Sequence, residues 1–417
     1  MKLFFDSGNW EFSSPSGGNG TIMDSDHARL FGLPLSYGTY DCKVPLTMGW
    51  VKLKVQCQTE GLSSPENLVT VMLSLHSVDG TPLRRLFTDV KPGGKRGSLV
   101  LSRLFEVPAN IELFGIRADV AYGVVTLGLR WPGNGSAVFS SPELIVSEPP
   151  SERKARVVVT YFGYKPGSIT DRVTSIFGEI GTCSPDIVCL REALFSSGPP
   201  DAEPIGGPVT SLMSEMAVKY KTYVTGHFTE ADNGYMFNTS ALFNRSGSLV
   251  GKYRKVHLAL GEVERGTSPG SEFPVFETEF ARVGLSTCWD AAFPETARCL
   301  RLNGAELMIS STMGDFWETD MAHARENGLW YAIAGVNRNT GGPYPPSRII
   351  DPEGTLLCGC GSGYDSDSHV YADIDFNRRY FQWWLSVGPC EGEGPSLYKL
   401  ERRPDAYGSI VCTTDIR

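Results

Sequence analysis

The most informative stretch of the chain covers residues 284–295 and reads Gly-Leu-Ser-Thr-Cys-Trp-Asp-Ala-Ala-Phe-Pro-Glu. It begins within 282–287, an apolar run typical of a buried strand, and it reaches Pro294, a residue favoured in the first turn of a helix. The pattern predicts a strand, a sharp turn at Cys288, and a helix that ends near Asn303-Gly304. A thiol at such a junction is a candidate nucleophile, because a helix N-terminus stabilises a thiolate and offers backbone amides to an oxyanion.

Around this stretch, the second part of the chain alternates between apolar runs and helical patterns. The runs that predict strands are 157–159, 186–190, 222–228, 236–249, 282–287, 306–310, 330–336 and 347–350, and the patterns that predict helices are 168–180, 208–220, 294–303 and 318–328. This alternation is typical of an α/β architecture.

The first 147 residues have a different pattern, with apolar and polar residues alternating at a period of two. Runs at 51–58, 69–75 and 125–131 each have one apolar and one polar face, and turn-forming stretches such as 79–80 and 91–94 separate them. No convincing helical period occurs there. We therefore predict an antiparallel β domain over residues 1–147, with a sandwich or jelly-roll-like topology.

The domain boundary falls at a polar, doubly proline-punctuated segment, residues 148–155, which is typical of a linker. The α/β domain then spans 156–375. The remaining segment, 376–417, is strongly aromatic at 380–384, and we expect it to pack on the core, on the β domain or at a subunit interface.

The composition is that of a globular protein. The chain has 417 residues, 41% hydrophobic and 20% charged, which is enough for two domains with real cores. The net charge of −9 argues against nucleic acid or an anionic membrane as a partner. No apolar run is long enough to span a bilayer, and Asp6 interrupts the opening before a signal peptide could develop, so we expect a cytoplasmic protein.

Ten cysteines are too sparse for a disulfide scaffold, and no C-x-x-C pair occurs. We therefore expect reduced thiols and neither a metal nor a cofactor.

Two further polar residues stand where strands end. Glu192 follows the buried run 186–190, where an isolated carboxylate would cost several kcal/mol unless it is paired or functional. Lys255 follows a predicted strand pair. Active sites of α/β proteins form at the carboxyl ends of strands, so both side chains are candidates for the same site as Cys288.

Taken together, these segments resemble the nitrilase, or carbon–nitrogen hydrolase, superfamily over roughly residues 155–375. The matching segments, in chain order, are 185–192 (Pro-Asp-Ile-Val-Cys-Leu-Arg-Glu), 251–258 (Gly-Lys-Tyr-Arg-Lys-Val-His-Leu), 264–270 (Glu-Arg-Gly-Thr-Ser-Pro-Gly), 284–295, 324–327 (Ala-Arg-Glu-Asn) and 347–354 (Ser-Arg-Ile-Ile-Asp-Pro-Glu-Gly). The resemblance implies an αββα sandwich and a homo-oligomer built from dimers.

The resemblance also implies roles for the candidate residues. Cys288 is the expected nucleophile and Glu192 the base that takes its proton. Lys255 and the backbone amide of Trp289 are expected to stabilise the oxyanion of a thioester-forming attack. The expected reaction is hydrolysis of an amide or N-carbamoyl amine.

Two features of the match stand out. Glu262 and Glu264 compete for the family's second glutamate, and the six-residue spacing from Glu264 to Pro269-Gly270 favours Glu264, which would orient Lys255 or assist the water step. Arg191 stands where the family usually has proline, so the backbone or the pocket entrance should differ there.

The expected substrate is a small amide or carbamoyl compound. Trp289-Asp290 after the nucleophile is more similar to amidases and N-carbamoyl-amine hydrolases than to enzymes that cleave nitriles, and Trp289, Phe293 and Trp317 are expected to line the pocket. Alternative functions are a nitrilase, a soluble thioester-based acyltransferase, and, outside enzymes, a carbohydrate- or protein-binding module with a scaffold-like C-terminal half.

Overall fold

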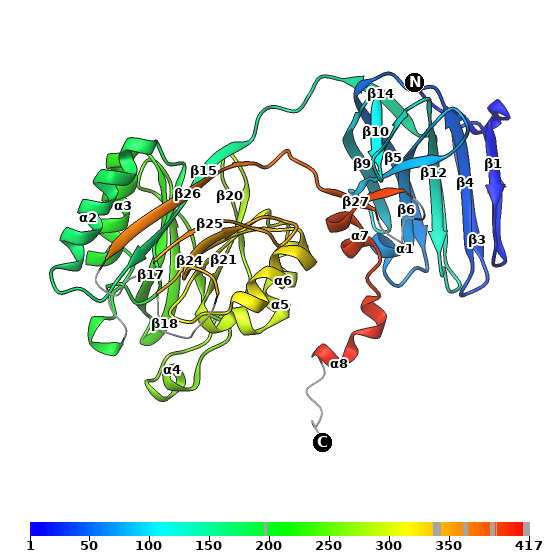
Figure 1. Ribbon diagram of the computed structural model, residues 1–417. Helices are drawn as coiled ribbons and strands as arrows, with labels where there is room; N and C mark the ends of the chain where they lie inside the picture. Colours follow the sequence, from blue (N-terminus) through cyan, green and yellow to red (C-terminus); the bar gives the residue numbers. More distant parts are fainter. Residues whose placement is uncertain (196–197, 337–342, 362–365, 384–387, 389, 412–417) are drawn as a thin grey trace. The chain divides into compact units, whose positions relative to one another are not determined.

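The computed structural model describes residues 1–195, 198–336, 343–361, 366–383, 388 and 390–411 (Figure 1). The chain forms two compact units. The first comprises Met1–Ser151 together with Arg379–Arg417, and the second is Glu152–Arg378. The chain therefore leaves the first unit, builds the second and returns to the first.

The first unit consists mainly of two seven-stranded sheets. One has the order β1-β4-β12-β6-β7-β28-β27, and the other has the order β2-β3-β13-β5-β9-β8 with β14 paired to β5. The strands are β1 (Trp10–Ser13), β2 (Gly18–Ile22), β3 (His27–Gly32), β4 (Tyr37–Val44), β5 (Gly49–Glu60), β6 (Val69–His76), β7 (Pro82–Phe87), β8 (Asp89–Pro92), β9 (Ser98–Val107), β12 (Tyr122–Arg130), β13 (Ser136–Ser140), β14 (Glu143–Ser147), β27 (Phe381–Trp383) and β28 (Glu391–Glu393), with a separate hairpin of β10 (Asn110–Leu113) and β11 (Ile116–Asp119).

In this unit, the alternation of apolar and polar residues in the sequence corresponds to an alternation of buried and exposed side chains. In β5, Val51, Leu53, Val55 and Cys57 are buried, whereas the alternate lysines and glutamines are exposed or half-buried. A single helical turn, α1 (Pro65–Leu68), lies among the strands and is too short to produce a helical period in the sequence.

The C-terminal segment completes the first unit. Strand β28 pairs in parallel with β7, and β27 pairs with β28. Glu393 in β28 forms a buried ion pair with Arg103 of β9, with a shortest N–O distance of 2.6 Å. This segment was expected on the core, on the β domain or at a subunit interface, and its strands β27 and β28 belong to a sheet of the first unit. Helices α7 (Gly394–Leu400) and α8 (Gly408–Val411) follow these strands along the chain.

The second unit has four layers. Its two six-stranded sheets have the orders β19-β18-β17-β16-β15-β26 and β20-β21-β22-β23-β24-β25. Helices α2 and α3 cover the outer face of one sheet, and α5 and α6 cover the other (Figure 1). Strand β15 contacts β23 and β24 of the other sheet, so the sheets pack face to face. This is an αββα sandwich.

Most predicted elements of this unit are present. The strands are β15 (Lys154–Phe162), β16 (Ile187–Cys189), β17 (Tyr223–Asp232), β18 (Tyr235–Phe243), β19 (Leu249–Arg254), β20 (Val275–Glu277), β21 (Arg282–Thr287), β22 (Leu307–Ser311), β23 (Trp330–Ala334), β24 (Ser347–Ile350), β25 (Leu356–Cys360) and β26 (Asp367–Asp375), and the helices are α2 (Ile169–Ile180), α3 (Pro208–Tyr220), α4 (Leu260–Glu264), α5 (Pro294–Leu302) and α6 (Trp317–Asn327). The predicted strand pair at 236–249 extends to Arg254, and α4 was not predicted.

The arrangement of the central strands positions the polar residues. Strands β15, β16 and β17 are parallel, as are β21, β22 and β23. Glu192 follows the carboxyl end of β16, and Cys288 follows that of β21, so the two sheets present these residues at the same edge of the sandwich.

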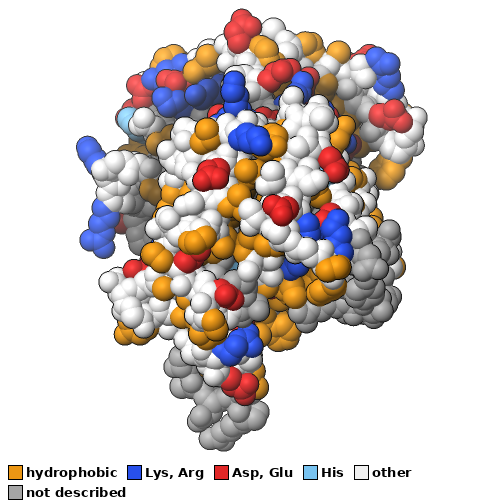
Figure 2. Space-filling view, turned by 90° about the vertical axis from the view of Figure 1, so that its left-hand side faces the viewer, with side chains coloured by type: hydrophobic (Ala, Val, Ile, Leu, Met, Phe, Trp, Pro, Cys, Tyr) orange, Lys and Arg blue, Asp and Glu red, His pale blue; other side chains and the backbone are white. Residues whose placement is uncertain are grey.

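On the face shown in Figure 2, acidic and basic side chains lie interspersed rather than in a patch of one sign. No helix within the described residues is long and apolar enough to cross a membrane. Likewise, the part of the chain that the structure describes contains no group of three or more His, Cys, Asp or Glu side chains arranged to hold a metal ion.

Candidate active site

The predicted strand-to-helix junction is present, and it holds Cys288 in a strained conformation. Cys288 has φ +46°, in the left-handed region that a non-glycine residue enters only when its surroundings impose it. It begins a short 3-10 turn, Cys288–Ala292, before α5 opens at Pro294. Trp289 is the second residue of this turn, and the first N–H groups of a helical turn have no carbonyl partner within it.

A buried carboxylate imposes this turn. Asp290 is fully buried and accepts hydrogen bonds from the backbone N–H of Thr287 at 2.9 Å and from the hydroxyl of Tyr253 at 2.7 Å. It also accepts from the backbone N–H of His257 at 3.1 Å and pairs with that residue's Nδ1 at 2.9 Å. Asp290 therefore joins the cysteine turn to the segment that carries Lys255.

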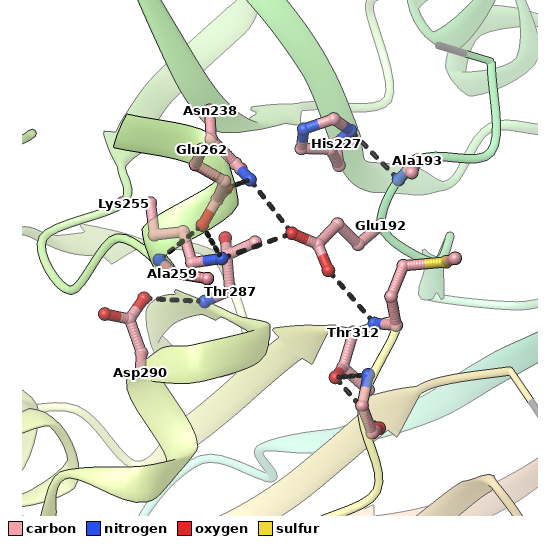
Figure 3. A network of polar contacts seen from close by, with 12 residues as sticks. Glu192, Ala193, His227, Asn238, Lys255, Ala259, Glu262, Thr287, Asp290 and Thr312 are labelled. Atoms are coloured by element: carbon pink, nitrogen blue, oxygen red, sulfur yellow. Dashed lines mark hydrogen bonds and ion pairs between the residues drawn. The ribbon is translucent and has the colours of Figure 1, made fainter. Parts of the chain in front are cut away.

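Beside the turn, Lys255 lies between two carboxylates (Figure 3). Its Nζ is 2.8 Å from Glu262 Oε2 and 3.4 Å from Glu192 Oε1. The amide nitrogen of Asn238 in β18 bridges the same carboxylates, donating to Glu192 Oε1 at 2.9 Å and to Glu262 Oε1 at 2.6 Å. All four side chains are buried, so the ammonium and the bridging amide compensate carboxylates that water does not solvate.

The other oxygen of Glu192 faces the second sheet. Glu192 Oε2 accepts a hydrogen bond from the backbone N–H of Met313 at 3.0 Å, just beyond the end of β22. The Glu192 carboxylate also interacts with the Cys288 thiol. The Glu192 carboxylate therefore contacts the Lys255 ammonium, the Cys288 thiol and the Met313 backbone.

These contacts determine the charge states of the site. Burial alone would raise the pKa of Glu192, but the charges of Lys255 and the hydrogen bond from Asn238 hold it below its ordinary value. Burial and the neighbouring Glu192 charge raise the pKa of Cys288 to about 11. The pKa of Lys255 is raised despite its burial, because the charges of Glu192 and Glu262 favour its charged form. At neutral pH the site holds a carboxylate, an ammonium and a neutral thiol.

A histidine that was not predicted also lines the site. His227 of β17 is buried, and its Nδ1 accepts a hydrogen bond from the backbone N–H of Ala193 at 3.1 Å, which leaves the proton on Nε2. Burial lowers the pKa of His227 to about 4, so this ring is neutral at physiological pH. Ala193 has φ +49°, and the hydrogen bond helps to hold this turn after Glu192.

The site opens into a cavity of about 510 Å³, a size suited to a small molecule. Besides the residues above, its lining includes Trp289, which is 41% exposed, and Phe316 and Arg265. Polar lining comes from Thr229 and Thr267.

Two of the expected substrate-binding residues do not line this cavity. Phe293 instead stacks on the His257 ring, with centroids 3.9 Å apart, and meets the Trp289 ring edge-on. Trp317, at the start of α6, contacts Tyr344. Phe293 therefore packs against a lining residue, and of the three expected residues Trp289 is the one that lines the cavity.

The structure brings Glu262, and not the expected Glu264, into contact with Lys255. Glu264 is exposed, whereas Glu262 contacts Lys255. Both lie in the one-turn helix α4, and residues two apart on a helix point in different directions. Glu262 Oε2 also accepts from the backbone N–H of Ala259 at 2.7 Å, which fixes the start of α4.

Arg191, which stands at the family's usual proline position, is buried at the edge of the site. Its guanidinium donates to the carbonyl oxygens of Glu192 at 2.8 Å and of Ala193 at 3.3 Å. The difference from the family that we expected at this position is therefore an arginine side chain, and it stabilises the turn after Glu192.

Comparisons with known proteins find a matching family model and similar sequences. A family model described as carbon-nitrogen hydrolase matches residues 178–381. The chain is 31% identical over 252 residues to omega-amidase NIT2 of Homo sapiens, covering 55% of this chain and 90% of the relative. The chain belongs to the carbon–nitrogen hydrolase family. The resemblance seen in the sequence is confirmed at this level.

Two further proteins match this chain with comparable coverage. A citrullinase of Francisella tularensis is 31% identical over 230 residues, covering 49% of this chain and 75% of the relative. A crystal structure of a carbon–nitrogen hydrolase from Helicobacter pylori G27 has a TM-score of 0.51 and 21% identity, covering 62% of this chain and 98% of that one. The α/β fold is confirmed, and the chain is a hydrolase of amide-type carbon–nitrogen bonds.

Proposed function

We propose that this carbon–nitrogen hydrolase cleaves a small-molecule amide or N-carbamoyl amine through a thioester on Cys288. The observation that carries the proposal is the convergence of the Cys288 thiol, the Glu192 carboxylate and the Lys255 ammonium in one cavity. Relatives named omega-amidase and citrullinase support an amide or ureido substrate.

In the first half-reaction, Glu192 accepts the thiol proton while Sγ attacks the carbonyl carbon. Because the pKa of Cys288 is raised to about 11, the resting thiol needs this base. Lys255 and the Trp289 N–H stabilise the negative charge on the carbonyl oxygen. Glu192 then gives its proton to the leaving nitrogen, the C–N bond breaks, and ammonia or an amine departs.

In the second half-reaction, Glu192 accepts a proton from water, which attacks the thioester carbonyl. The C–S bond breaks, Cys288 recovers its proton, and the product leaves as a carboxylic acid, or as a carbamic acid from a carbamoyl substrate. Glu262 holds the Lys255 ammonium through its 2.8 Å contact, and Asn238 holds both carboxylates. Glu262 and Asn238 are thus positioning residues in this mechanism.

The test is ammonia release over a panel of primary amides, N-carbamoyl amines, monoamides of dicarboxylic acids and nitriles. We expect Cys288→Ala, Glu192→Gln and Lys255→Met each to reduce turnover of the best substrate by at least about 1,000-fold. Cys358→Ala is the matched control, because this half-buried thiol lies on β25 and does not line the cavity. Substantial activity in any of the three folded variants contradicts the proposed mechanism.

Product analysis separates the rival chemistries. A nitrilase would release carboxylate from the nitriles, whereas an acyltransferase would release little carboxylate until an acceptor amine is added. A further experiment tests the thioester itself. The Glu192→Gln variant is incubated with an activated ester, and mass spectrometry shows whether the acyl group stays on Cys288.

The other expectations stay predictions. We propose that the first unit is a β-sandwich-type accessory domain and that the second unit assembles into dimers through its sandwich. Sedimentation of the purified chain tests the second point. A cytoplasmic location is tested by fractionation.

A further inference from the structure

We infer that the substrate of this enzyme carries a carboxylate, held by the guanidinium of Arg265, which lines the same cavity as Glu192, Lys255 and Cys288. The inference rests on the proposed function and specifies its substrate class: an amide or N-carbamoyl amine that also bears a free carboxylate.

The placement of Arg265 carries the first step. Arg265 directly follows α4, and its backbone N–H donates to the Glu262 carbonyl at 3.2 Å, so it lies about one turn beyond the residue that contacts Lys255. Residues three apart share a helix face, and both side chains line the same cavity. Glu262 is buried, whereas Arg265 is exposed.

The second step is the charge of the cavity. Lys255 is compensated by Glu192 and Glu262, but no carboxylate of the described residues lies within ion-pair distance of Arg265. His227 is neutral at physiological pH, since its pKa is lowered to about 4. Arg265 is therefore the lining cation whose charge the described part of the chain leaves without an ion-pair partner.

This distribution also orients a substrate. The two carboxylates that contact Lys255 repel an anionic group, whereas Arg265 attracts one, because a guanidinium donates two parallel hydrogen bonds to a carboxylate. A substrate with one amide and one carboxylate therefore binds with the amide at Cys288 and the carboxylate at Arg265. A substrate ammonium would face an uncompensated cation there instead.

The surface does not provide an alternative source of selectivity on the face in Figure 2, where acidic and basic side chains are interspersed. With a net charge of −9, the chain as a whole repels anions weakly. A cation in the cavity, Arg265, can therefore supply a selection for anions that this face does not.

The experiment compares three substrates that differ only at the end remote from the amide: succinamate, with a carboxylate; pentanamide, with an ethyl group in its place; and 4-aminobutanamide, with an aminomethyl group that is protonated at neutral pH. For the wild-type enzyme we expect the highest kcat/KM with succinamate. In Arg265→Gln, KM for succinamate should rise roughly 10-fold or more with kcat changed less than about threefold, because the contact is made in both ground and transition states. Kinetics with pentanamide should be unchanged.

Two further variants sharpen the comparison. Arg265→Lys should recover part of the succinamate affinity, and Arg265→Glu should shift the preference toward 4-aminobutanamide. Arg117→Gln is the matched control, because it removes an exposed guanidinium from β11 of the first unit. Binding of succinamate to Cys288→Ala, with and without Arg265→Gln, gives the same comparison by calorimetry without turnover.

The outcomes separate the two proposals. Hydrolysis of pentanamide but not succinamate leaves the proposed function standing and overturns the role of Arg265. An unchanged KM for succinamate in Arg265→Gln, or an equal loss on all three substrates, also overturns it. Failure of every amide and carbamoyl substrate in the wider panel, from folded wild-type protein, contradicts the proposed function and with it this inference.

Discussion

At the scale of single residues, the site is governed by one ammonium shared between two carboxylates. Lys255 is almost completely buried, with Glu262 Oε2 at 2.8 Å and Glu192 Oε1 at 3.4 Å. The shared charge keeps Glu192 ionised even though burial favours its neutral form. A carboxylate can therefore act as the base at neutral pH.

The pH profile of kcat/KM with a neutral amide follows from these ionisations. Glu192 has its pKa below the ordinary 4.5, so activity should be lost on the acid side only as pH falls below about 4.5. Activity should fall again near pH 11, where Cys288 ionises and Glu192 no longer receives its proton. Because the pKa of His227 is about 4, no inflection is expected near pH 6.5, and a limb there would implicate a histidine instead.

The two glutamates of α4 should differ sharply in their effects. We expect Glu262→Gln to lower kcat by about 100-fold, because Lys255 loses one of its two compensating carboxylates and its orientation. Glu264→Gln is the matched control at an exposed position and should stay within about twofold of wild type. Steady-state kinetics on one amide decide the comparison; the reverse ranking would restore Glu264 as the second glutamate.

At the scale of elements, the cysteine turn is stabilised from the other sheet. Tyr253 in β19 donates to Asp290 Oδ2, and the same hydroxyl accepts from the backbone N–H of Val256 at 3.1 Å. Asp290 in turn caps the strained turn at Cys288. The nucleophile's conformation thus depends on a strand of the sheet that carries Glu192.

Removing the Tyr253 hydroxyl should loosen this turn. We expect Tyr253→Phe to lower the free energy of unfolding by about 1–3 kcal/mol, because Asp290 loses a buried donor, and to lower kcat more than it changes KM. Tyr235→Phe is the matched control, since Tyr235 is 64% exposed. Urea denaturation and amide kinetics are the measurements, and unchanged stability and kcat would show that the turn holds without this contact.

At the scale of the whole molecule, the second unit is inserted between two parts of the first. Glu393 returns near the chain's end to form a bidentate pair with Arg103, and both side chains are less than 10% exposed. Because the segment pairs with β7 as a strand, it belongs to the first unit's sheet rather than forming a loose tail.

Breaking this pair should destabilise the first unit selectively. We expect Glu393→Ala to cost about 3–5 kcal/mol, since it removes the carboxylate that forms a buried ion pair with the Arg103 guanidinium. Glu152→Gln, which removes an exposed pair with Lys154, should change stability by less than about 1 kcal/mol. Calorimetry of the full chain should show a lower Tm for one transition, with Cys288-dependent activity retained at 25 °C. An unshifted transition would mean that the segment does not stabilise the unit.

Much of the fold and the central residues of the site followed from local patterns. An apolar run ending in a thiol before Pro294 specified strand, turn and helix, and the positions of Glu192 and Lys255 after strands brought them to the same edge of the sandwich. Asn238 was missed, although a polar run beginning at Asn238 within an otherwise apolar strand was a usable signal.

Two features could not be predicted from local patterns: the glutamate that contacts Lys255 and the residues that line the cavity. Helix α4 buries a carboxylate, Glu262, and exposes Leu260 and Val263, so its pattern is the reverse of an amphipathic helix. Spacing along the chain therefore favoured Glu264, whereas the carboxylate that contacts Lys255 is Glu262. Likewise, the aromatic character of Phe293 and Trp317 indicates burial but not whether a ring faces a cavity or a neighbouring side chain.

By itself, the sequence determined most of the element types and, through its resemblance to known motifs, the family, because both depend on local periodicity and on short segments at strand ends. Only the tertiary structure decided which carboxylate meets Lys255, that Asn238 bridges the pair, that Arg265 faces the cavity, and that the C-terminal strand completes the N-terminal sheet. These are contacts between segments distant along the chain or choices between faces of one short turn. Packing and the compensation of buried charge select them, and neither is encoded in the spacing of nearby residues.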